Sequence, residues 1–219
     1  MQKVPKNVKK ALTLLLRKGR KQLNRLIMIN ITILASGSGS NAENIANYFS
    51  ASDKFNVTAI LSNKKDAYVH QRAEKLGIPH SSFTKADMED GTLLKTLKEL
   101  NTDYVILAGF LLKVSDEILE NYPMKIINIH PALLPLYGGK GMYGMKVHEA
   151  VVANKEKQSG ITIHLIDNNY DQGTTIFQAT VDVLPTDTPD DVAHKVHELE
   201  YKYFPSVIEK YALGEITIK

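Results

Sequence analysis

The chain has 219 residues, of which 43% are hydrophobic, and its formal net charge at pH 7 is +3. This length allows one α/β domain with a sizeable core, and no apolar run reaches the roughly 18–20 residues needed to span a bilayer. Because the chain has no cysteine, disulfides, cysteine-ligated zinc and a thiol nucleophile are excluded, and a reducing cytoplasm is favoured.

The positive charge is concentrated at the N-terminus. Residues 1–26 contain nine Lys and Arg and no acidic residue, which leaves 18 of the 27 basic residues against all 24 acidic ones. The remaining body is therefore acidic, and a nucleic-acid-binding body is not indicated. We interpret residues 1–26 as a basic extension without a part in the chemistry, with a membrane-surface or RNA-contacting arm as the alternative. Residues 27–219 are expected to form a single domain.

The first predicted element is a strand over residues 27–34, followed by the loop Ser36-Gly-Ser-Gly-Ser-Asn41 and a helix over 42–49. A strand, a small-residue loop and a helix N-terminus form an anion site, because backbone N–H groups approach the oxygens and the helix dipole favours negative charge. The dinucleotide and Walker spacings of glycine are both absent. The loop therefore predicts a phosphomonoester site, with a plain tight turn as the alternative.

Strands and helices then alternate along the chain. Strands are predicted over residues 55–62, 78–83, 103–108 and 126–130, and helices over 67–76, 87–100 and 115–122, the last capped by Ser115. This alternation is typical of a mainly parallel sheet, whose ligands bind beyond the carboxyl ends of the strands. We therefore expect the loops 36–41 and 109–114 to converge with His130 on one cleft.

The C-terminal third has a different pattern. A helix is predicted at about 147–154, alternating strands at 161–166 and 176–183, and a long helix from Thr188 that is interrupted near Pro205 and resumes to Leu213. Turn formers between the two strands predict an antiparallel hairpin with a shaped loop. The predicted fold class is α/β: a Rossmann-like, mostly parallel twisted sheet with helices on both faces and an antiparallel hairpin in the C-terminal third.

The clearest chemical signal lies at the end of the strand 126–130. Because side chains alternate along a strand, Asn128 and His130 share one face, and Pro131 stops the strand immediately after them. The amide can donate to a developing oxyanion, and the imidazole beside it can move a proton. An isolated Asn-x-His motif more often has a structural role, but the residues that flank this one favour a catalytic role.

Three sequence elements occur in order: the Gly-Ser-Gly-Ser-Asn loop, Asn128-Ile-His-Pro-Ala-Leu-Leu-Pro135, and Gly160-Ile-Thr-Ile-His164 followed by Tyr170-Asp-Gln-Gly173. Over about residues 28–218 the chain resembles the phosphoribosylglycinamide formyltransferase family. The second element is shared by several formyl-folate enzymes, whereas the phosphate loop implies a ribonucleotide acceptor. The resemblance implies transfer of the formyl group of 10-formyltetrahydrofolate, a co-substrate, to the amine of 5'-phosphoribosylglycinamide. A tetrahedral oxyanion forms on the way, and no metal is involved.

The resemblance also implies roles for individual residues. Asn128 and protonated His130 would polarise the formyl oxygen, His130 would be the general acid, and Asp171 would favour the protonated ring. From the residues alone, Asp167 is an equal candidate for that carboxylate. Thr162 and His164 would support the loop that carries Asp171, although a buried histidine without such a role is an equal interpretation of His164.

Binding residues are likewise implied for both substrates. For the ribonucleotide they are Gly39, Ser40 and Asn41 at the phosphate, and His197, Glu198, Leu199 and Glu200 elsewhere. Glu200 would meet the glycinamide portion, with a solvated helix carboxylate as its alternative. For the folate they are Leu111, Leu112, Lys113, Val114, Asn128, Asp167, Asn168, Asn169, Tyr170 and Asp171. Which of Lys85, Lys113 and Lys140, if any, meets the folate glutamate tail stays open.

Other functions remain as alternatives. A formyltetrahydrofolate hydrolase would use the same Asn, His and Asp with water as acceptor, but we expect it to carry an N-terminal regulatory domain. A methionyl-tRNA formyltransferase would carry a C-terminal RNA-binding domain. A non-catalytic folate or nucleotide-binding module would have lost part of the catalytic set. We therefore expect a cytoplasmic enzyme, monomeric or homodimeric, that acts on small molecules and binds neither nucleic acid nor membrane.

Overall fold

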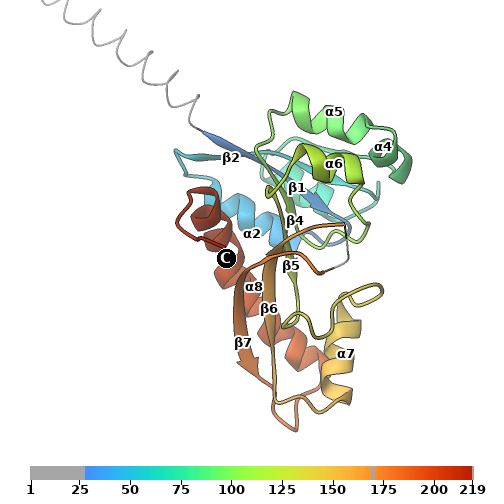
Figure 1. Ribbon diagram of the computed structural model, residues 1–219, viewed down its shortest axis with the longest axis vertical. Coiled ribbons are helices and arrows are strands. Elements are labelled where there is room, and N and C mark those ends of the chain that lie inside the picture. The colour runs from blue at the N-terminus through green and yellow to red at the C-terminus, as the bar shows by residue number, and fades with distance from the viewer. Residues whose placement is uncertain (1–27, 169–170, 219) are drawn as a thin grey trace, which may run out of the picture.

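The computed structural model describes residues 28–168 and 171–218, and the calls on residues 1–27, Asn169 and Tyr170 lie outside them. Within this part of the chain one sheet has the strand order β3-β2-β1-β4-β5-β6-β7 (Figure 1). Its strands are β1 (Ile29–Ala35), β2 (Phe55–Ser62), β3 (His80–Ser82), β4 (Tyr104–Leu107), β5 (Ile126–His130), β6 (Gln158–Leu165) and β7 (Thr175–Asp182). Strands β1 to β5 pair in parallel, and β6 pairs antiparallel with both β5 and β7. The predicted fold class is confirmed.

The helices lie on both faces of this sheet. They are α2 (Ser40–Phe49), α3 (Val69–Lys75), α4 (Lys85–Glu89), α5 (Thr92–Glu99), α6 (Asp116–Asn121), α7 (Met145–Ala153) and α8 (Pro189–Ala212). No helix in the described ranges is long and apolar enough to cross a membrane. In Figure 1, α4, α5 and α6 lie together at one end of the molecule, while β6, β7 and α7 extend from the other.

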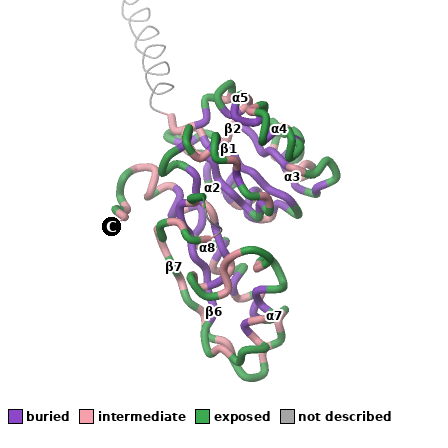
Figure 2. Tube along the Cα trace, turned by 45° about the vertical axis from the view of Figure 1, so that its right-hand side comes forward, coloured by how far each residue is buried: buried purple, intermediate pink, exposed green. Residues whose placement is uncertain are grey.

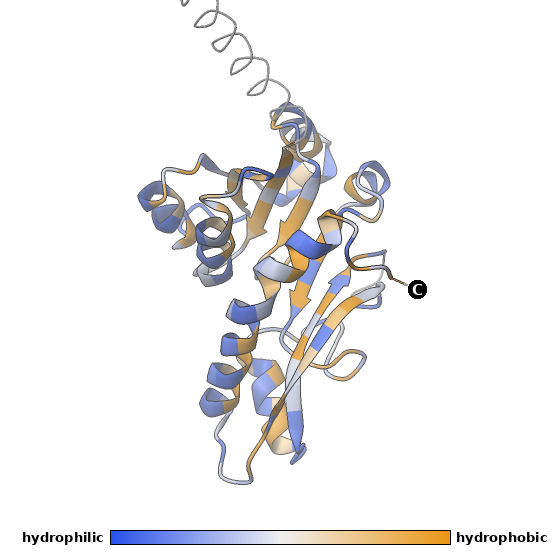
Figure 3. Ribbon diagram, turned by 90° about the vertical axis from the view of Figure 1, so that its left-hand side faces the viewer, coloured by the Kyte–Doolittle hydropathy of each residue, from blue (hydrophilic) through white to orange (hydrophobic). Residues whose placement is uncertain are grey.

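Two hydrophobic clusters hold the layers together, one on each face of the sheet. Alternate residues of β1 feed them: Ile31 and Ile33 pack with α2, α3 and α8, whereas Leu34 packs with α4, α5 and α6. All three side chains are fully buried, and each such burial stabilises the fold by about 1.5–3 kcal/mol. Figures 2 and 3 show the result, with buried, apolar strands in the centre and exposed, polar surfaces on the outer sides of the helices.

The helix predicted over residues 87–100 is wrong as a single element. The structure divides this region into α4 and α5, and Gly91 between them has φ +86°. Thr84 and Asp87 form a reciprocal capping box at the start of α4, which places the N-cap of a helix three residues before Asp87. A glycine in the left-handed region ends the helical path without the steric cost that a Cβ would bring.

The interruption predicted at Pro205 is also wrong, because α8 runs continuously through this residue. Proline has no N–H to donate to the carbonyl four residues earlier, which is that of Tyr201. The side-chain amide of Asn44 in α2 donates to that carbonyl oxygen instead, at 3.0 Å. A contact distant in sequence therefore supplies the partner that the helix lacks.

The predicted side-chain cap at Ser115 is wrong as well. Ser115 occupies the position before α6, but its side chain makes no capping hydrogen bond. Its hydroxyl oxygen is buried and has no hydrogen-bond partner within residues 28–168 and 171–218.

The topology places the candidate site. The strand order reverses between β1 and β4, since β2 and β3 lie on one side of β1 and the later strands on the other. Ligands of open α/β sheets bind beyond the strand carboxyl ends at such a point. The loops after β1 and β4 meet there, and His130 ends the adjacent strand β5.

Candidate active site

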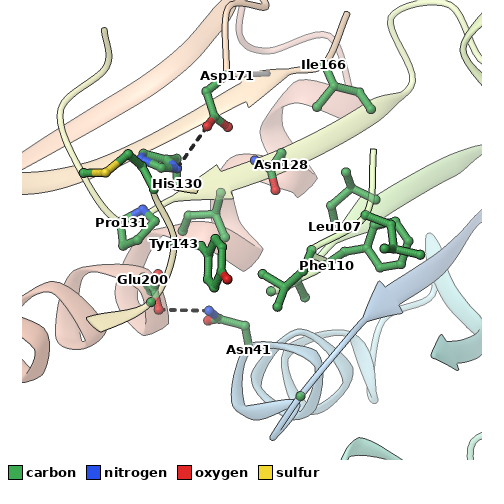
Figure 4. A pocket seen from close by; sticks show the side chains of 18 of the residues that line it. Asn41, Leu107, Phe110, Asn128, His130, Pro131, Tyr143, Ile166, Asp171 and Glu200 are labelled. Atoms are coloured by element: carbon green, nitrogen blue, oxygen red, sulfur yellow. Dashed lines mark hydrogen bonds and ion pairs between the residues drawn. The ribbon is translucent and has the colours of Figure 1, made fainter. Parts of the chain in front are cut away.

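A cavity of ≈ 680 Å³ lies at this edge of the sheet (Figure 4). Its walls come from the loops after β1, β4 and β5, from the segment before α7, from the loop after β6, and from one side of α8. The lining residues are 37–41, 107–114, 128–131, 139–144, His148, Ile166, Asp167, Asp171, Val196, His197 and Glu200. The cleft expected from the strand carboxyl ends is therefore present.

Gly39 shapes the part of the cavity formed by the loop after β1. It has φ +77° and directly precedes α2, which begins at Ser40, two residues earlier than predicted. A Cβ built on Gly39 would lie 2.3 Å from Cγ2 of Val69, so both the backbone conformation and the packing require glycine. Backbone N–H groups in the first turn of a helix have no partner within the helix. The cavity thus has the N-terminus of a ten-residue helix in its wall.

Asn128, His130 and Asp171 converge on the opposite side of the cavity, as Figure 4 shows. Nδ1 of His130 lies 3.7 Å from Oδ2 of Asp171. Nε2 of His130 lies 2.7 Å from the backbone carbonyl oxygen of Tyr137 and donates to it. Because that carbonyl occupies Nε2, Nδ1 is the nitrogen able to exchange a proton with a ligand.

His164 orients the amide of Asn128. Nδ1 of His164 lies 2.9 Å from the carbonyl oxygen of Leu165, which can only accept, so Nδ1 carries the proton. Burial lowers the pKa of His164, against a smaller opposing effect of that hydrogen bond. The ring is therefore neutral, and its Nε2 accepts a hydrogen bond of 3.0 Å from the Asn128 amide group. The second amide hydrogen of Asn128 stays available to a ligand.

Asp171 is held by its backbone and by two neighbouring segments. Its φ is +55°, an uncommon conformation that a short polar side chain tolerates better than others do. Oδ2 accepts a 2.9 Å hydrogen bond from the backbone N–H of Gly139, and Oδ1 lies 3.7 Å from Nε2 of His164. The carboxylate thus faces both histidine rings from the loop after β6.

Thr162 supports a different segment from the one expected. Its hydroxyl donates to the carbonyl oxygen of Ala132 at 2.7 Å and accepts from the N–H of Leu134 at 2.9 Å. Thr162 therefore fixes the chain directly after His130 rather than the loop that carries Asp171.

A buried carboxylate lies at the far end of the cavity. Glu200 of α8 is only 6% exposed, so the solvated helix carboxylate considered as an alternative is not what the structure has. Its Oε2 accepts from the side-chain amide of Asn41 at 2.9 Å and from Nδ1 of His197 at 2.7 Å. The hydrogen bond to Glu200 raises the pKa of His197, and partial burial opposes the rise.

The third part of the wall is mostly apolar. Leu107, Phe110 and Ile166 line it (Figure 4). The backbone N–H of Leu111 donates to the hydroxyl of Ser36 at 2.9 Å, and that hydroxyl donates to Asn63 at 2.6 Å. These bonds tie the segment after β4 to the ends of β1 and β2.

Most of the predicted site residues line this one cavity, but not all of them. Those in its wall are Gly39, Ser40, Asn41, Leu111, Leu112, Lys113, Val114, Asn128, His130, Asp167, Asp171, His197 and Glu200. Glu198 and Leu199 are not in it. Helical spacing gives His197 and Glu200 a common face, whereas Glu198 pairs with His194 at 3.7 Å on the surface and Leu199 packs against the core. Asn168 is exposed outside the wall.

The three candidate lysines also differ in whether they line the cavity. Lys113 and Lys140 line the cavity. Lys85 does not; it pairs with Glu89 at 3.2 Å on an exposed face of α4.

Sequence reasoning gave no binding role to several residues of the wall, among them Phe110, Tyr143, His148 and Ile166. Phe110 and Ile166 directly adjoin segments that were chosen, so a wider margin around each motif would have included them. Tyr143 and His148 lie in and after a glycine-rich segment whose path the sequence does not determine.

The fold agrees with comparisons to known proteins. The family model described as formyl transferase matches residues 29–208, and the chain belongs to this family. Among curated relatives, it is 39% identical over 185 residues to the chloroplastic phosphoribosylglycinamide formyltransferase of Arabidopsis thaliana. It is 32% identical over 196 residues to the phosphoribosylglycinamide formyltransferase of Escherichia coli K12, covering 87% of this chain and 90% of that protein.

Solved structures give the same result. Glycinamide ribonucleotide transformylase 1 from Symbiobacterium toebii superposes with a TM-score of 0.80 at 30% identity, covering 88% of this chain and 91% of that one. Phosphoribosylglycinamide formyltransferase from Streptococcus pneumoniae does so with a TM-score of 0.75 at 35% identity, covering 84% and 99%. The match to the Arabidopsis protein covers 81% of this chain but 63% of that protein, so the chain spans less than two thirds of it.

Proposed function

We propose that this chain transfers the formyl group of 10-formyltetrahydrofolate to the amine of 5'-phosphoribosylglycinamide. The observation that carries the proposal is the convergence on one cavity of Asn128, His130 and Asp171 with a helix N-terminus at Gly39. The first three supply the groups that acyl transfer needs, and the last supplies an anion site. Membership of the formyl transferase family and the names of its relatives support the same reaction.

The ribonucleotide would bind with its phosphate at the start of α2. The unpaired backbone N–H groups of the first turn and the helix dipole favour a phosphate there. Gly39 lets the chain turn into α2 at this point, because its backbone conformation and its packing against Val69 both require glycine. The amine would then lie towards His130, with the ribose and the glycinamide amide between the two ends.

The folate would occupy the apolar part of the wall. Leu107, Phe110 and Ile166 suit the flat pterin ring, and the segment 111–114 offers backbone groups to its polar edge. Lys113 and Lys140 are the candidates for the glutamate tail, because Lys85 lies outside the cavity.

The proposed formyl transfer needs no covalent enzyme intermediate. The amine nitrogen forms a bond to the formyl carbon, and the bond between that carbon and N10 then breaks. One proton leaves the amine and one reaches N10. The free amide hydrogen of Asn128 would donate to the oxyanion, an interaction worth about 3–4 kcal/mol in comparable sites.

His130 would deliver the proton to N10 from Nδ1. Asp171 lies 3.7 Å from that nitrogen, so its carboxylate is placed to take part in the transfer of this proton. The bond from Nε2 to the Tyr137 carbonyl fixes the plane of the ring. A proton relay through a water beside Asp171 fits the same geometry.

We propose a cytoplasmic enzyme, monomeric or homodimeric, whose partners are small molecules rather than nucleic acid or membrane. The absence of cysteine and the acidic body outside residues 1–26 support this.

Release of tetrahydrofolate, measured with and without the ribonucleotide, tests the reaction. We expect release only when both substrates are present, and a fall in kcat of at least about a hundredfold in His130→Ala. Release without the ribonucleotide would indicate a hydrolase. Folate binding without release under either condition would indicate a non-catalytic binding module, and either result would refute the proposal.

A further inference from the structure

Tyr137 connects His130 to the turn that follows α7. Its backbone carbonyl oxygen accepts the 2.7 Å hydrogen bond from Nε2 of His130. Its side-chain hydroxyl donates to Oε1 of Glu156 at 2.7 Å and accepts from the side-chain amide of Asn154 at 2.9 Å. Tyr137 is not among the residues that line the cavity. It therefore acts on the reacting end through His130 rather than through a ligand.

The backbone of Tyr137 has a conformation that needs support from its surroundings. Its φ is +57°, and a bulky residue other than glycine is strained in this left-handed region. Such a conformation persists only where surrounding contacts hold it. The side chain of Tyr137 packs against the buried core, and two hydrogen bonds fix its hydroxyl. The side chain therefore supplies the contacts that hold the backbone carbonyl in its direction.

The turn that receives the hydroxyl is itself closed by backbone hydrogen bonds. The N–H of Lys155 donates to the carbonyl oxygen of Val152 at 3.0 Å, and that of Glu156 donates to the carbonyl oxygen of Val151 at 3.1 Å. With Lys155 at φ +53°, these bonds form the Schellman motif that ends many helices. Glu156 thus extends from a fixed turn, and Val151 ties this turn to the buried core.

The hydroxyl of Tyr137 is a hydrogen-bond donor at neutral pH. Burial raises the pKa of Tyr137; the hydrogen bond from Asn154 opposes this rise, and the Glu156 carboxylate adds to it. Glu156 is only partly buried, so water can solvate its carboxylate when the tyrosine hydroxyl is removed. The hydroxyl can therefore be deleted without leaving an unsolvated charge.

The segment that begins at Tyr137 also holds Asp171. The backbone N–H of Gly139 donates to Oδ2 of Asp171 at 2.9 Å, and a Cβ built on Gly138 would lie 3.3 Å from Cβ of Asp171. Residues 137–139 therefore contact both members of the catalytic pair, in which Nδ1 of His130 lies 3.7 Å from Oδ2 of Asp171. A change of backbone path at Tyr137 would alter both contacts at once.

We propose that Tyr137 is a positioning residue for His130. Its hydroxyl, anchored on Glu156 and Asn154, fixes the backbone carbonyl that determines the direction and the tautomer of the imidazole ring. Nδ1 of this ring is thereby kept towards Asp171 and the cavity. The inference rests on the proposed function, in which Nδ1 delivers the proton to N10. Tyr137 touches no reacting atom, so it affects the rate of the chemical step and not the binding of either substrate.

Removal of the hydroxyl tests this role in the reaction. Tyr137→Phe keeps the ring and its packing but loses both hydrogen bonds. We expect kcat to fall about tenfold, the usual effect of one lost hydrogen bond, with the KM of both substrates unchanged. Glu156→Ala should have a similar effect, and Glu156→Gln, which retains an acceptor oxygen, should recover most of the rate. An effect confined to KM, or equal losses in the two Glu156 variants, would overturn the proposal.

A double-mutant cycle and a matched control show whether the effect belongs to this contact. Tyr137→Phe combined with Glu156→Ala should lose no more rate than the more impaired single variant, because both changes break the same hydrogen bond. Tyr211→Phe removes a different tyrosine hydroxyl, which donates to the carbonyl oxygen of Met124 at 3.0 Å outside the cavity wall. Its kcat should equal that of the wild type. Fully additive losses, or a tenfold loss in Tyr211→Phe, would contradict a specific role for Tyr137.

The His130 ring can also be observed without either substrate. NMR of the imidazole nitrogens, assigned by the signals missing from His130→Ala, reports which nitrogen of the neutral ring carries the proton. We expect Nε2 alone in the wild type and a mixture of both tautomers in Tyr137→Phe, or in Glu156→Ala where Tyr137→Phe does not fold. An unchanged ring would overturn the proposal even if kcat or the melting temperature fell, because Tyr137 would then have only a structural role. This measurement needs no formyl transfer, so it remains decisive where the proposed reaction fails.

Discussion

Three histidines in or beside the cavity differ in the direction of their pKa shifts because their nearest neighbours differ. His164 and His148 are buried, and burial lowers the pKa of each. His197 is half exposed and hydrogen-bonded to Glu200, which raises its pKa. Two rings are thus kept neutral by burial, while the third favours its charged form beside a carboxylate.

These shifts give the protein a defined response to acid. An unfolded histidine has a pKa of about 6.5, above the folded values of His148 and His164, so the unfolded state binds more protons as the pH falls. Stability from these residues is therefore complete above about pH 6.5 and declines as the pH falls towards the folded pKa values. We expect melting temperatures measured from pH 7.5 to 5.0 to fall less steeply in His148→Leu than in the wild type.

His197, whose pKa is shifted in the opposite direction, provides a check on these melting temperatures. His197, whose folded pKa is raised, contributes stability below about pH 6.5 and loses it as the pH rises through the folded value. His197→Gln should therefore lose this contribution at the acidic end of the range, the opposite of His148→Leu. Parallel curves for all three proteins would contradict the assigned protonation states.

At the scale of elements, the continuity of α8 depends on α2. Asn44 donates to the carbonyl oxygen of Tyr201, the group that Pro205 leaves without its helical partner. We expect Asn44→Ala to lower the free energy of unfolding by about 1 kcal/mol. For a domain of this size, that change corresponds to roughly 2–4 °C in melting temperature.

A double-mutant cycle isolates this effect. In Pro205→Ala the backbone regains an N–H at position 205, which can donate to the Tyr201 carbonyl, so Asn44→Ala should then cost much less. Equal costs of Asn44→Ala in both backgrounds would show that Asn44 acts elsewhere. Asn47→Ala, on the exposed side of α2, is the matched control and should have little effect.

At the scale of the whole molecule, the parallel sheet was predictable because its strands are short apolar runs between periodic helices. The strand over 55–62 has the predicted bounds. The break at Gly91 and the continuity of α8 were not predicted. A single Gly or Pro within a periodic segment can be tolerated or can end a helix. At Pro205 the helix continues because Asn44, which is 161 residues away in sequence, supplies the missing hydrogen-bond donor.

The candidate site, too, has residues that the sequence could predict and residues that it could not. Asn128 and His130 lie at a strand end with recognisable neighbours, and chain topology brings the loop after β1 to them. His148 carries no such signal, since a histidine on an amphipathic helix is most often a surface or core residue. Its burial in the cavity wall, with an Nδ1 that has no hydrogen-bond partner among the described residues, is visible only in the structure.

Ligand binding should stabilise the whole molecule, because the cavity joins elements that are distant in sequence. The Asn41–Glu200 hydrogen bond connects α2 with α8, and the catalytic residues come from β5 and the loop after β6. Ribonucleotide at one hundred times its Kd should add about 2.7 kcal/mol to the free energy of unfolding. We expect this to raise the melting temperature by roughly 5–10 °C.

The two substrates should be separable in the same measurement. Asn41→Ala weakens the ribonucleotide end alone, so its melting temperature should rise less with a fixed ribonucleotide concentration and as much as the wild type's with formylfolate. Each variant is compared with its own unliganded value, because Asn41→Ala also removes a hydrogen bond of the free protein. If the formylfolate shift were lost to the same extent, the division of the cavity into a ribonucleotide end and a folate end would be wrong.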